Sequence, residues 1–179
     1  MRDTSVTIEG YLTERKLAEA LAHITGDAWL GKQVKVPGTR MRWDMAFSHE
    51  SSTLVVEYDG DEHYRNSIKI KGDMAKDQAA RDLGYSVVRF PYWVQLDTCT
   101  LGHFFGLGAT IVQDFPHGFI TTKLFPASYC ELGVERFARE LDGLPSHVQA
   151  AVTQSIQDRA VDHGVEFVLP SGLRHIIGG

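Results

Sequence analysis

The stretch LVVEYDGDEHYRN, residues 54–66, changes from apolar β-formers to charged side chains without a break. Its first half has the composition of a buried strand. Its second half gathers ionisable groups around one glycine, namely Glu57, Asp59, Asp61, Glu62 and His63. Carboxylates this close together repel one another unless a positive charge lies among them. The stretch therefore predicts a strand that ends at a cation.

The composition of the chain predicts one soluble domain. Of its 179 residues, 43% are hydrophobic, which is enough for one core and a small C-terminal appendage. No apolar run reaches the roughly 18 residues that a membrane span needs. Two cysteines, Cys99 and Cys130, without a signal-like N-terminus predict a reduced, cytoplasmic protein. The net charge of -5 gives no general attraction to nucleic acid, although metal-binding carboxylates contribute to that charge.

The first half of the chain predicts a helix followed by two strands. LTERKLAEALAHITG has apolar residues at helical spacing, with Thr13 as its cap and Gly26 as its end. RMRWDMAF alternates as a strand, with one face made of Met41, Trp43, Met45 and Phe47 and the other of Arg42, Asp44 and Ala46. After the turn SHESS, TLVVEYD predicts a strand with Leu54, Val56 and Tyr58 on one face and Val55, Glu57 and Asp59 on the other.

The second half predicts one more strand and several helices. A helix over residues 73–83 stops at Gly84, and Pro91 closes the strand YSVVRFPYW. Further helices are expected at 101–105, 127–141 and 146–163. The last two have apolar faces, made of Leu132, Phe137 and Leu141 and of Val148, Val152, Ile156 and Val161. These helices either pack on the core or pair with a second copy of the chain in a homodimer.

The spacing of the first two strands brings two acidic residues together. If residues 49–52 form a four-residue loop, Phe47 pairs with Leu54, and Asp44 lies opposite Glu57. Opposed residues share a face with Cβ atoms about 4.5–5.5 Å apart, so the two carboxylates repel each other. A hard divalent cation such as Mg²⁺ is the economical compensation. The alternative is a solvent-facing acidic pair that is balanced by arginine or lysine side chains.

Several segments together resemble the PD-(D/E)xK nuclease superfamily. These segments are ERKL, WDMAF, VVEYDGDEH and KDQAARDLGYSVVRF, and they are most similar to small nucleases akin to the very-short-patch repair endonucleases. The resemblance covers residues 14–96. It implies a restriction-endonuclease-like α/β fold, in which residues 1–106 form a central mixed β-sheet flanked by helices and residues 107–179 form a helical C-terminal extension.

The resemblance also implies a metal site. Asp44 and Glu57 match the metal ligands of the superfamily, together with the carbonyl group of Tyr58. Glu14 matches an acidic residue that binds the metal through water, with Glu19 as the other candidate. The implied cofactor is Mg²⁺, for which Mn²⁺ substitutes.

One position departs from the superfamily pattern. Asp59 stands where the superfamily has a lysine that orients the attacking water and stabilises charge on the phosphate. The resemblance implies that His63 takes over as general base or water-positioning residue. Otherwise a lysine from the following segment reaches back into the site, and the candidates are Lys69, Lys71 and Lys76. An ordinary surface histidine is the alternative for His63.

Basic residues follow the acidic cluster, namely Arg65, Lys69, Lys71, Lys76 and Arg81. A nuclease would use such residues to hold the DNA backbone. A solvated helix face with ion pairs to Asp73 and Asp77 explains them equally well. A zinc site is disfavoured, because no compact finger pattern matches the spacing of Cys99, His103, His117 and Cys130.

The function predicted from these features is a Mg²⁺-dependent DNA endonuclease with a nicking, repair, restriction or mobile-element role. Two alternatives stay open. One is a DNA-binding or assembly protein that keeps the nuclease fold without catalysis, which the missing lysine and the negative net charge both permit. The other is a metal-dependent hydrolase of a small phosphate ester.

Overall fold

The computed structural model describes residues 5–177, and a mixed sheet of four strands lies at its centre. The strands are ordered β2 (Trp29–Lys35), β3 (Arg42–His49), β4 (Ser52–Asp59) and β5 (Ser86–Pro91). The first three are antiparallel neighbours, and β5 runs parallel to β4. The expected α/β architecture with a mixed sheet flanked by helices is confirmed.

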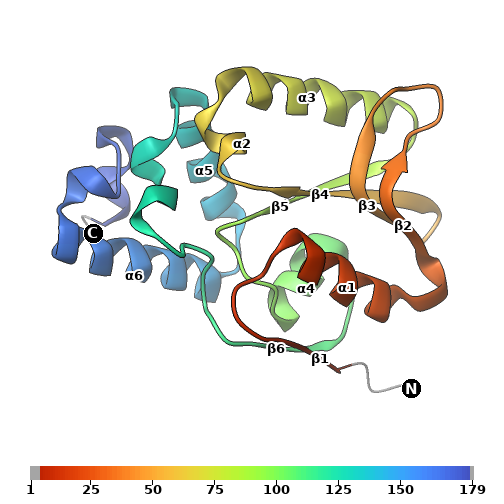
Figure 1. The fold of residues 1–179 in the computed structure, drawn as a ribbon, viewed down its shortest axis with the longest axis horizontal. Helices are drawn as coiled ribbons and strands as arrows, with labels where there is room; N and C mark the ends of the chain where they lie inside the picture. Colours follow the sequence, from red (N-terminus) through yellow and green to blue (C-terminus); the bar gives the residue numbers. More distant parts are fainter. Residues whose placement is uncertain (1–4, 178–179) are drawn as a thin grey trace.

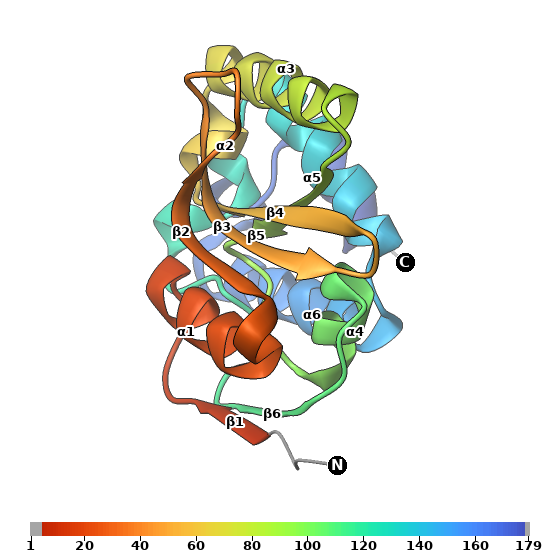
Figure 2. The ribbon, with the colours of Figure 1, turned by 90° about the vertical axis from the view of Figure 1, so that its right-hand side faces the viewer.

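Helices cover both faces of this sheet (Figures 1 and 2). They are α1 (Glu14–Thr25), α2 (Glu62–Arg65), α3 (Ser67–Asp82), α4 (Thr98–Phe105), α5 (Glu131–Gly143) and α6 (Ser146–His163). Figure 2 shows α3 on one face of the sheet and α1 with α4 on the other. A separate parallel pair, β1 (Ser5–Ile8) with β6 (Thr110–Gln113), lies beyond α1 and α4. Among residues 5–177, no helix combines the length and apolar character needed to cross a membrane.

The sheet divides the buried apolar side chains into a large and a small cluster. The large cluster includes Met45, Phe47, Leu54 and Val56 with residues of α1 and α4. The small cluster lies towards α3 and consists of Val36, Trp43, Ala46, Val55 and Ala80. The predicted alternation of β4 is confirmed. The prediction for Trp43 is wrong, because its ring packs with Ala46 and Val55 instead of with Met45 and Phe47.

Local signals explain where the helices begin and end. The Thr13 side chain accepts a hydrogen bond from the Lys16 N–H at the start of α1, and Gly26 ends that helix with a positive φ of 53°, as predicted. The helix predicted over residues 73–83 begins earlier, at Ser67. Its start is fixed by Asn66, whose side chain accepts hydrogen bonds from the N–H groups of Ile68 and Lys69. The early start matters because it places more of the basic stretch on one helix.

The β3–β4 hairpin has the predicted register with a shorter turn. His49 pairs with Ser52, so the turn consists of Glu50 and Ser51 instead of the expected four residues. Glu50 adopts a positive φ of 53°, which such a tight turn requires. Phe47 pairs with Leu54 as expected.

The C-terminal residues share the large apolar cluster. Most of the predicted apolar positions of α5 and α6 are buried in it, including Phe137, Leu141, Val148, Val152 and Ile156. Leu132 and Val161 are the exceptions, since neither belongs to the cluster and Val161 is 86% exposed. The helices therefore pack on the rest of the chain. The division at residue 106 and a homodimer stay predictions.

Candidate active site

Asp44 and Glu57 lie next to each other on β3 and β4. The Asp44 N–H donates to Glu57 Oε1 over 3.2 Å, and the Tyr58 N–H donates to Asp44 Oδ2 over 2.9 Å. The Gln33 amide, from β2, also donates to Asp44 Oδ1 over 3.3 Å. Each carboxylate thus reaches the backbone of the opposite strand, and the two groups form one acidic cluster.

Glu14, at the start of α1, adds a third carboxylate. Burial raises the pKa of Glu14, and the charge of Asp44 raises it further, while Lys32 acts in the opposite direction. Burial also raises the pKa of Glu57; the hydrogen bond from Lys76 lowers it, whereas the charge of Asp44 raises it. In both cases the outcome is a pKa above the ordinary value, so positive side chains balance this cluster only in part.

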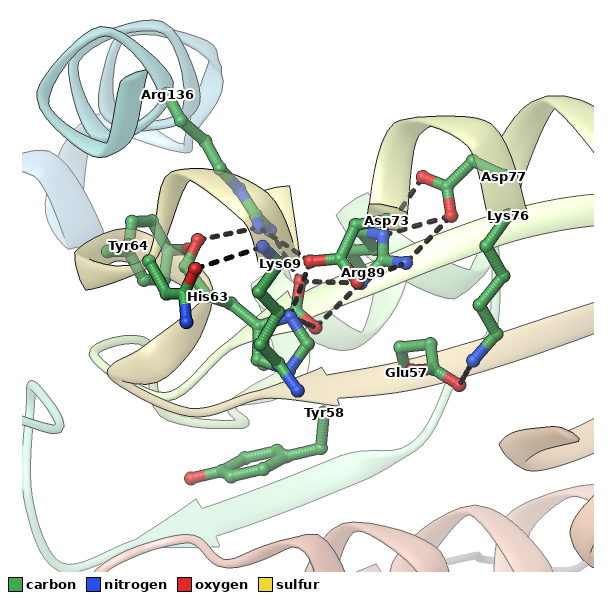
Figure 3. Close-up of polar contacts among 12 residues, drawn as sticks. Glu57, Tyr58, His63, Tyr64, Lys69, Asp73, Lys76, Asp77, Arg89 and Arg136 are labelled. Carbon is green, nitrogen blue, oxygen red and sulfur yellow. Dashed lines mark hydrogen bonds and ion pairs between the residues drawn. The ribbon is translucent and has the colours of Figure 1, made fainter. Parts of the chain in front are cut away.

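Lys76 reaches this cluster from α3. Its Nζ lies 2.6 Å from Glu57 Oε1 and 4.3 Å from the centre of the Trp43 ring. Figure 3 shows the Lys76 side chain extending from the helix towards Glu57. Lys76 is one of the three lysines proposed from the sequence to replace the superfamily lysine whose position Asp59 occupies. Lys69 and Lys71 are exposed, and no described acidic group forms an ion pair with either.

Asp59 and His63 belong to a second, buried cluster. Asp59 is fully buried, and Arg89 Nη1 donates to its two oxygens over 2.8 and 3.1 Å. Arg136, on α5, donates to Asp59 Oδ2 as well. His63 Nδ1 lies 3.2 Å from Asp59 Oδ1 and 2.6 Å from Asp73 Oδ2. Both oxygens of Asp59 are thus engaged by arginines.

Arg89 extends the cluster to α3 (Figure 3). Its guanidinium donates to both oxygens of Asp77 over 2.8 to 3.0 Å and lies 3.4 Å from Asp73. Burial alone would raise the pKa of Asp73, but the hydrogen bond from His63 and the charge of Arg89 lower it below its ordinary value. The second cluster therefore balances its own charges, unlike the group around Glu57.

Both clusters contain the positive charge that the acidic residues 57–63 need in order to lie close together. The positive charge near Glu57 comes from Lys76, and the charge near Asp59 comes from Arg89 and Arg136. Sequence reasoning missed both arginines. Arg89 had a usable signal, because a charged residue within the apolar strand SVVRFP needs a buried acidic partner. Arg136 gave none, since it lies on a helix far along the chain.

Three further residues that the sequence assigned to the site, Arg65, Arg81 and Tyr58, each contact a partner outside the first cluster. Arg65 pairs with Asp61 at 3.0 Å, and Arg81 lies 3.9 Å from Asp77. The Tyr58 hydroxyl donates to the Leu12 carbonyl, and burial raises the pKa of Tyr58 to about 12. Lys69 and Lys71 are thus exposed residues of the basic stretch that form no ion pair with a described acidic group.

The donor set of the first cluster suits a hard divalent cation. Glu14, Asp44 and Glu57 provide carboxylate oxygens from three elements, and oxygen is the ligand that Mg²⁺ and Mn²⁺ prefer. Burial is the largest cause of the raised pKa values of Glu14 and Glu57, and the charge of Asp44 raises both further. In the described part of the chain, however, these three do not bring ligand atoms within 4.8 Å of one another, so binding needs side-chain adjustment. Comparisons with family models, curated proteins and solved structures gave no match for this chain.

Proposed function

We propose that the protein is a metal-dependent DNA endonuclease whose reaction centre consists of Glu14, Asp44, Glu57 and Lys76. The observation that carries this proposal is the contact of 2.6 Å between Lys76 Nζ and Glu57, beside Asp44 on the neighbouring strand. Two acidic residues and a lysine are the side chains that the resemblance to PD-(D/E)xK nucleases requires. Here the lysine comes from α3 instead of from the strand.

The chemistry gives each of these residues a task. The scissile phosphodiester is an anion, so its hydrolysis requires an activated water and neutralisation of charge on the phosphate. A bound Mg²⁺ or Mn²⁺ would supply the acidified water and part of that neutralisation. Glu14, Asp44 and Glu57 would hold the ion. Lys76 would leave Glu57 when the ion binds and would orient the water or the phosphate instead.

Asp59 and His63 take a positioning role in this proposal. Their partners come from several elements, including Asp73 of α3 and Arg136 of α5. Because Lys76 lies one turn beyond Asp73 on the same helix, the buried cluster fixes the helix from which Lys76 reaches Glu57. The exposed Lys69 and Lys71 would contact the phosphate backbone from that helix.

A second candidate is a DNA-binding or assembly protein without catalysis. The spacing of the carboxylates favours this candidate, because Glu14, Asp44 and Glu57 do not bring ligand atoms within 4.8 Å of one another in the described part of the chain. The two candidates differ in what happens when the ion is supplied. Duplex DNA bound in Ca²⁺ excludes the small-ester hydrolase, and cleavage in Mg²⁺ or Mn²⁺ identifies the endonuclease.

The test is cleavage of supercoiled plasmid DNA by the purified full chain in EDTA, Ca²⁺, Mg²⁺ or Mn²⁺. We expect nicked or linear product with Mg²⁺ or Mn²⁺ alone, and none from Glu57→Gln, which keeps the shape but removes charge. Lys76→Met should lower kcat about 10²–10³-fold, the usual effect of losing one group that stabilises developing charge. Glu62→Gln and Lys123→Met are matched controls at exposed positions outside the proposed site and should retain kcat. Cleavage by Glu57→Gln at the wild-type rate would refute the proposal.

A further inference from the structure

Asp97, Cys99 and His147 bring three different ligand atoms together on the far side of the sheet from α3. One carboxylate oxygen, the Sγ and one ring nitrogen all lie within 4.8 Å of one another. Asp97 and Cys99 stand at the start of α4, whereas His147 lies in the first turn of α6. We propose that these residues form a binding site for Zn²⁺ that links α4 to α6.

The local structure holds the ligand atoms in place. Asp97 Oδ1 accepts a hydrogen bond from the Thr100 N–H over 2.7 Å, and Thr100 Oγ1 accepts one from the Asp97 N–H over the same distance. This capping box leaves the other carboxylate oxygen, Oδ2, directed at His147 Nε2 at 2.7 Å. The aspartate is therefore oriented before any ion arrives.

The chemistry of the ligands favours zinc over the ions proposed for the active site. A thiolate, an imidazole and a carboxylate are a borderline-soft set, which suits Zn²⁺ and not Mg²⁺. Zinc bonds of about 2.0–2.3 Å place tetrahedral ligand atoms roughly 3.3–3.8 Å apart. The contact between Asp97 and His147 must therefore open slightly. The His147 side chain, which is 50% exposed, has the freedom to rotate.

A cavity and a buried amide beside two of the three ligands give an independent reason to expect a ligand here. Asp97 and His147 line a cavity of about 430 Å³ together with Gln95. Gln95 is only 4% exposed, and its Nε2 has no hydrogen-bond partner among the described residues. A buried N–H group without an acceptor is costly. Three protein ligands leave the fourth position of zinc to water, and the cavity beside Asp97 and His147 has room for one.

This site shares only Cys99 with the four residues whose spacing was considered for zinc in the sequence. In the described part of the chain, the grouping around Cys99 contains Asp97 and His147, and it contains neither Cys130 nor His103 nor His117. The partners of Cys99 could not be found from spacing, because His147 lies 48 positions further along the chain. An ion at this point would fasten α6 to the strand–helix connection at Asp97.

The test is titration of the chelator-treated full chain with Co²⁺, which reports a bound thiolate through its charge-transfer absorption. We expect this absorption from the wild type, displacement by Zn²⁺, and at least about 100-fold weaker binding by Cys99→Ser and His147→Ala, since even indirect metal partners contribute 10–100-fold. Cys130→Ser and His103→Ala are the matched controls and should bind as the wild type does. Asp97→Asn keeps the helix cap and should also weaken binding.

A second readout is thermal unfolding with and without Zn²⁺. The Tm of the wild type should rise with Zn²⁺, because the ion links two elements only in the folded state. The rise should disappear in Cys99→Ser and His147→Ala. The proposal is overturned if the folded wild type shows no thiolate absorption, if Cys99→Ser shows the same absorption, or if Cys130→Ser loses it.

Discussion

Buried carboxyl groups of this protein differ in how well their charge is balanced. Glu57 has one lysine and faces Asp44, so its pKa is raised, chiefly by burial. Asp73 is buried as well, but His63, Arg89 and Arg136 surround it, and its pKa is lowered. At Glu57 the charge of Asp44 adds to the effect of burial, whereas at Asp73 the hydrogen bond from His63 and the charge of Arg89 outweigh burial. This contrast supports a metal near Glu57 and a positioning role for the cluster around Asp73.

The same contrast predicts opposite effects of pH on stability. The lowered pKa of Asp73 stabilises the folded state above the ordinary value of 3.8, and this contribution is lost as the pH falls through the folded-state pKa. Asp73→Asn should therefore lower the free energy of unfolding at pH 7 by about 1–3 kcal/mol, and the deficit should shrink in acid. Urea denaturation over a pH series measures it. A deficit that stays constant down to the lowest pH would contradict the charge argument.

Glu57→Gln should reveal a dependence of stability on pH that is opposite to that of Asp73→Asn, measured in the same urea denaturation series. The raised pKa of Glu57 means that the folded state binds its proton more tightly than the unfolded state does. The stability of the metal-free wild type should therefore fall as the pH rises from 4.5 through the raised pKa, relative to Glu57→Gln.

Asp59 is the residue where the superfamily pattern and the structure lead to different mutational expectations. Replacing it with the superfamily's lysine would place a third positive charge beside Arg89 and Arg136 in a fully buried position. Breaking a buried ion pair costs about 3–5 kcal/mol, so Asp59→Lys should unfold the protein or lower its Tm strongly without restoring activity. Asp61→Lys, at the exposed pair with Arg65, is the control and should cost less than about 1 kcal/mol. A folded and more active Asp59→Lys variant would show that Asp59 merely replaces the catalytic lysine.

At the scale of the elements, periodicity predicted the strands and helices that have one apolar and one polar face. The alternation of β4 and the capped α1 were readable because burial and capping follow from single residues such as Thr13. β2 was missed because its sequence, WLGKQVK, is interrupted by Gly31 and Gln33, both with positive φ. Trp43 lies on the opposite side because it stands beyond Met45, where the recorded β3–β4 pairing ends, and its ring packs in the small cluster under Lys76. The register of the β3–β4 hairpin was predictable as far as Met45 and Val56, where the recorded pairing ends, and the Asp44 N–H contacts Glu57 just beyond it.

The contact between α5 and α2 depends on a glycine. A Cβ at Gly133 would lie 1.8 Å from the carbonyl oxygen of Tyr64, which also accepts a hydrogen bond from the Cys130 N–H. Gly133→Ala should therefore destabilise the protein by at least about 1–3 kcal/mol despite the better helix propensity of alanine. Gly72→Ala, on α3 with nothing within 4 Å of the added Cβ, is the matched control and should stabilise by about 0.5–1 kcal/mol. Chemical denaturation of both variants measures the difference, and equal effects would mean that α5 does not approach α2 this closely.

At the scale of the whole molecule, the negative net charge does not decide the partner. Many positive groups are engaged internally, including Arg89, Arg136 and Lys76, while Lys69 and Lys71 remain available on the surface of α3. A bound divalent ion would also reduce the negative charge near Glu57. Under the proposed function, DNA binding should therefore depend on the ion and on α3, and not on the average charge of −5.

The last prediction concerns the C-terminal residues, whose helices were readable from the sequence but whose packing partners were not. After Leu144, six side chains belong to the large apolar cluster and are at most 3% exposed: Val148, Val152, Ile156, Val168, Leu169 and Leu173. Burial of each contributes about 1.5–3 kcal/mol, so their combined loss is on the order of 10 kcal/mol. Total stabilities are about 5–15 kcal/mol, and deletion of residues 145–179 should therefore leave an unfolded or aggregated chain.

Circular dichroism and size-exclusion chromatography of the truncated and full chains test this prediction. A matched control is Val161→Ser, which alters a side chain that is 86% exposed on α6 and should leave the fold and Tm unchanged. If α6 instead pairs two copies of the chain, Val161→Ser should shift the elution volume while the truncated chain stays folded. A truncated chain that is folded, with the oligomeric state of the full chain, would exclude both packing on the core and pairing through α6.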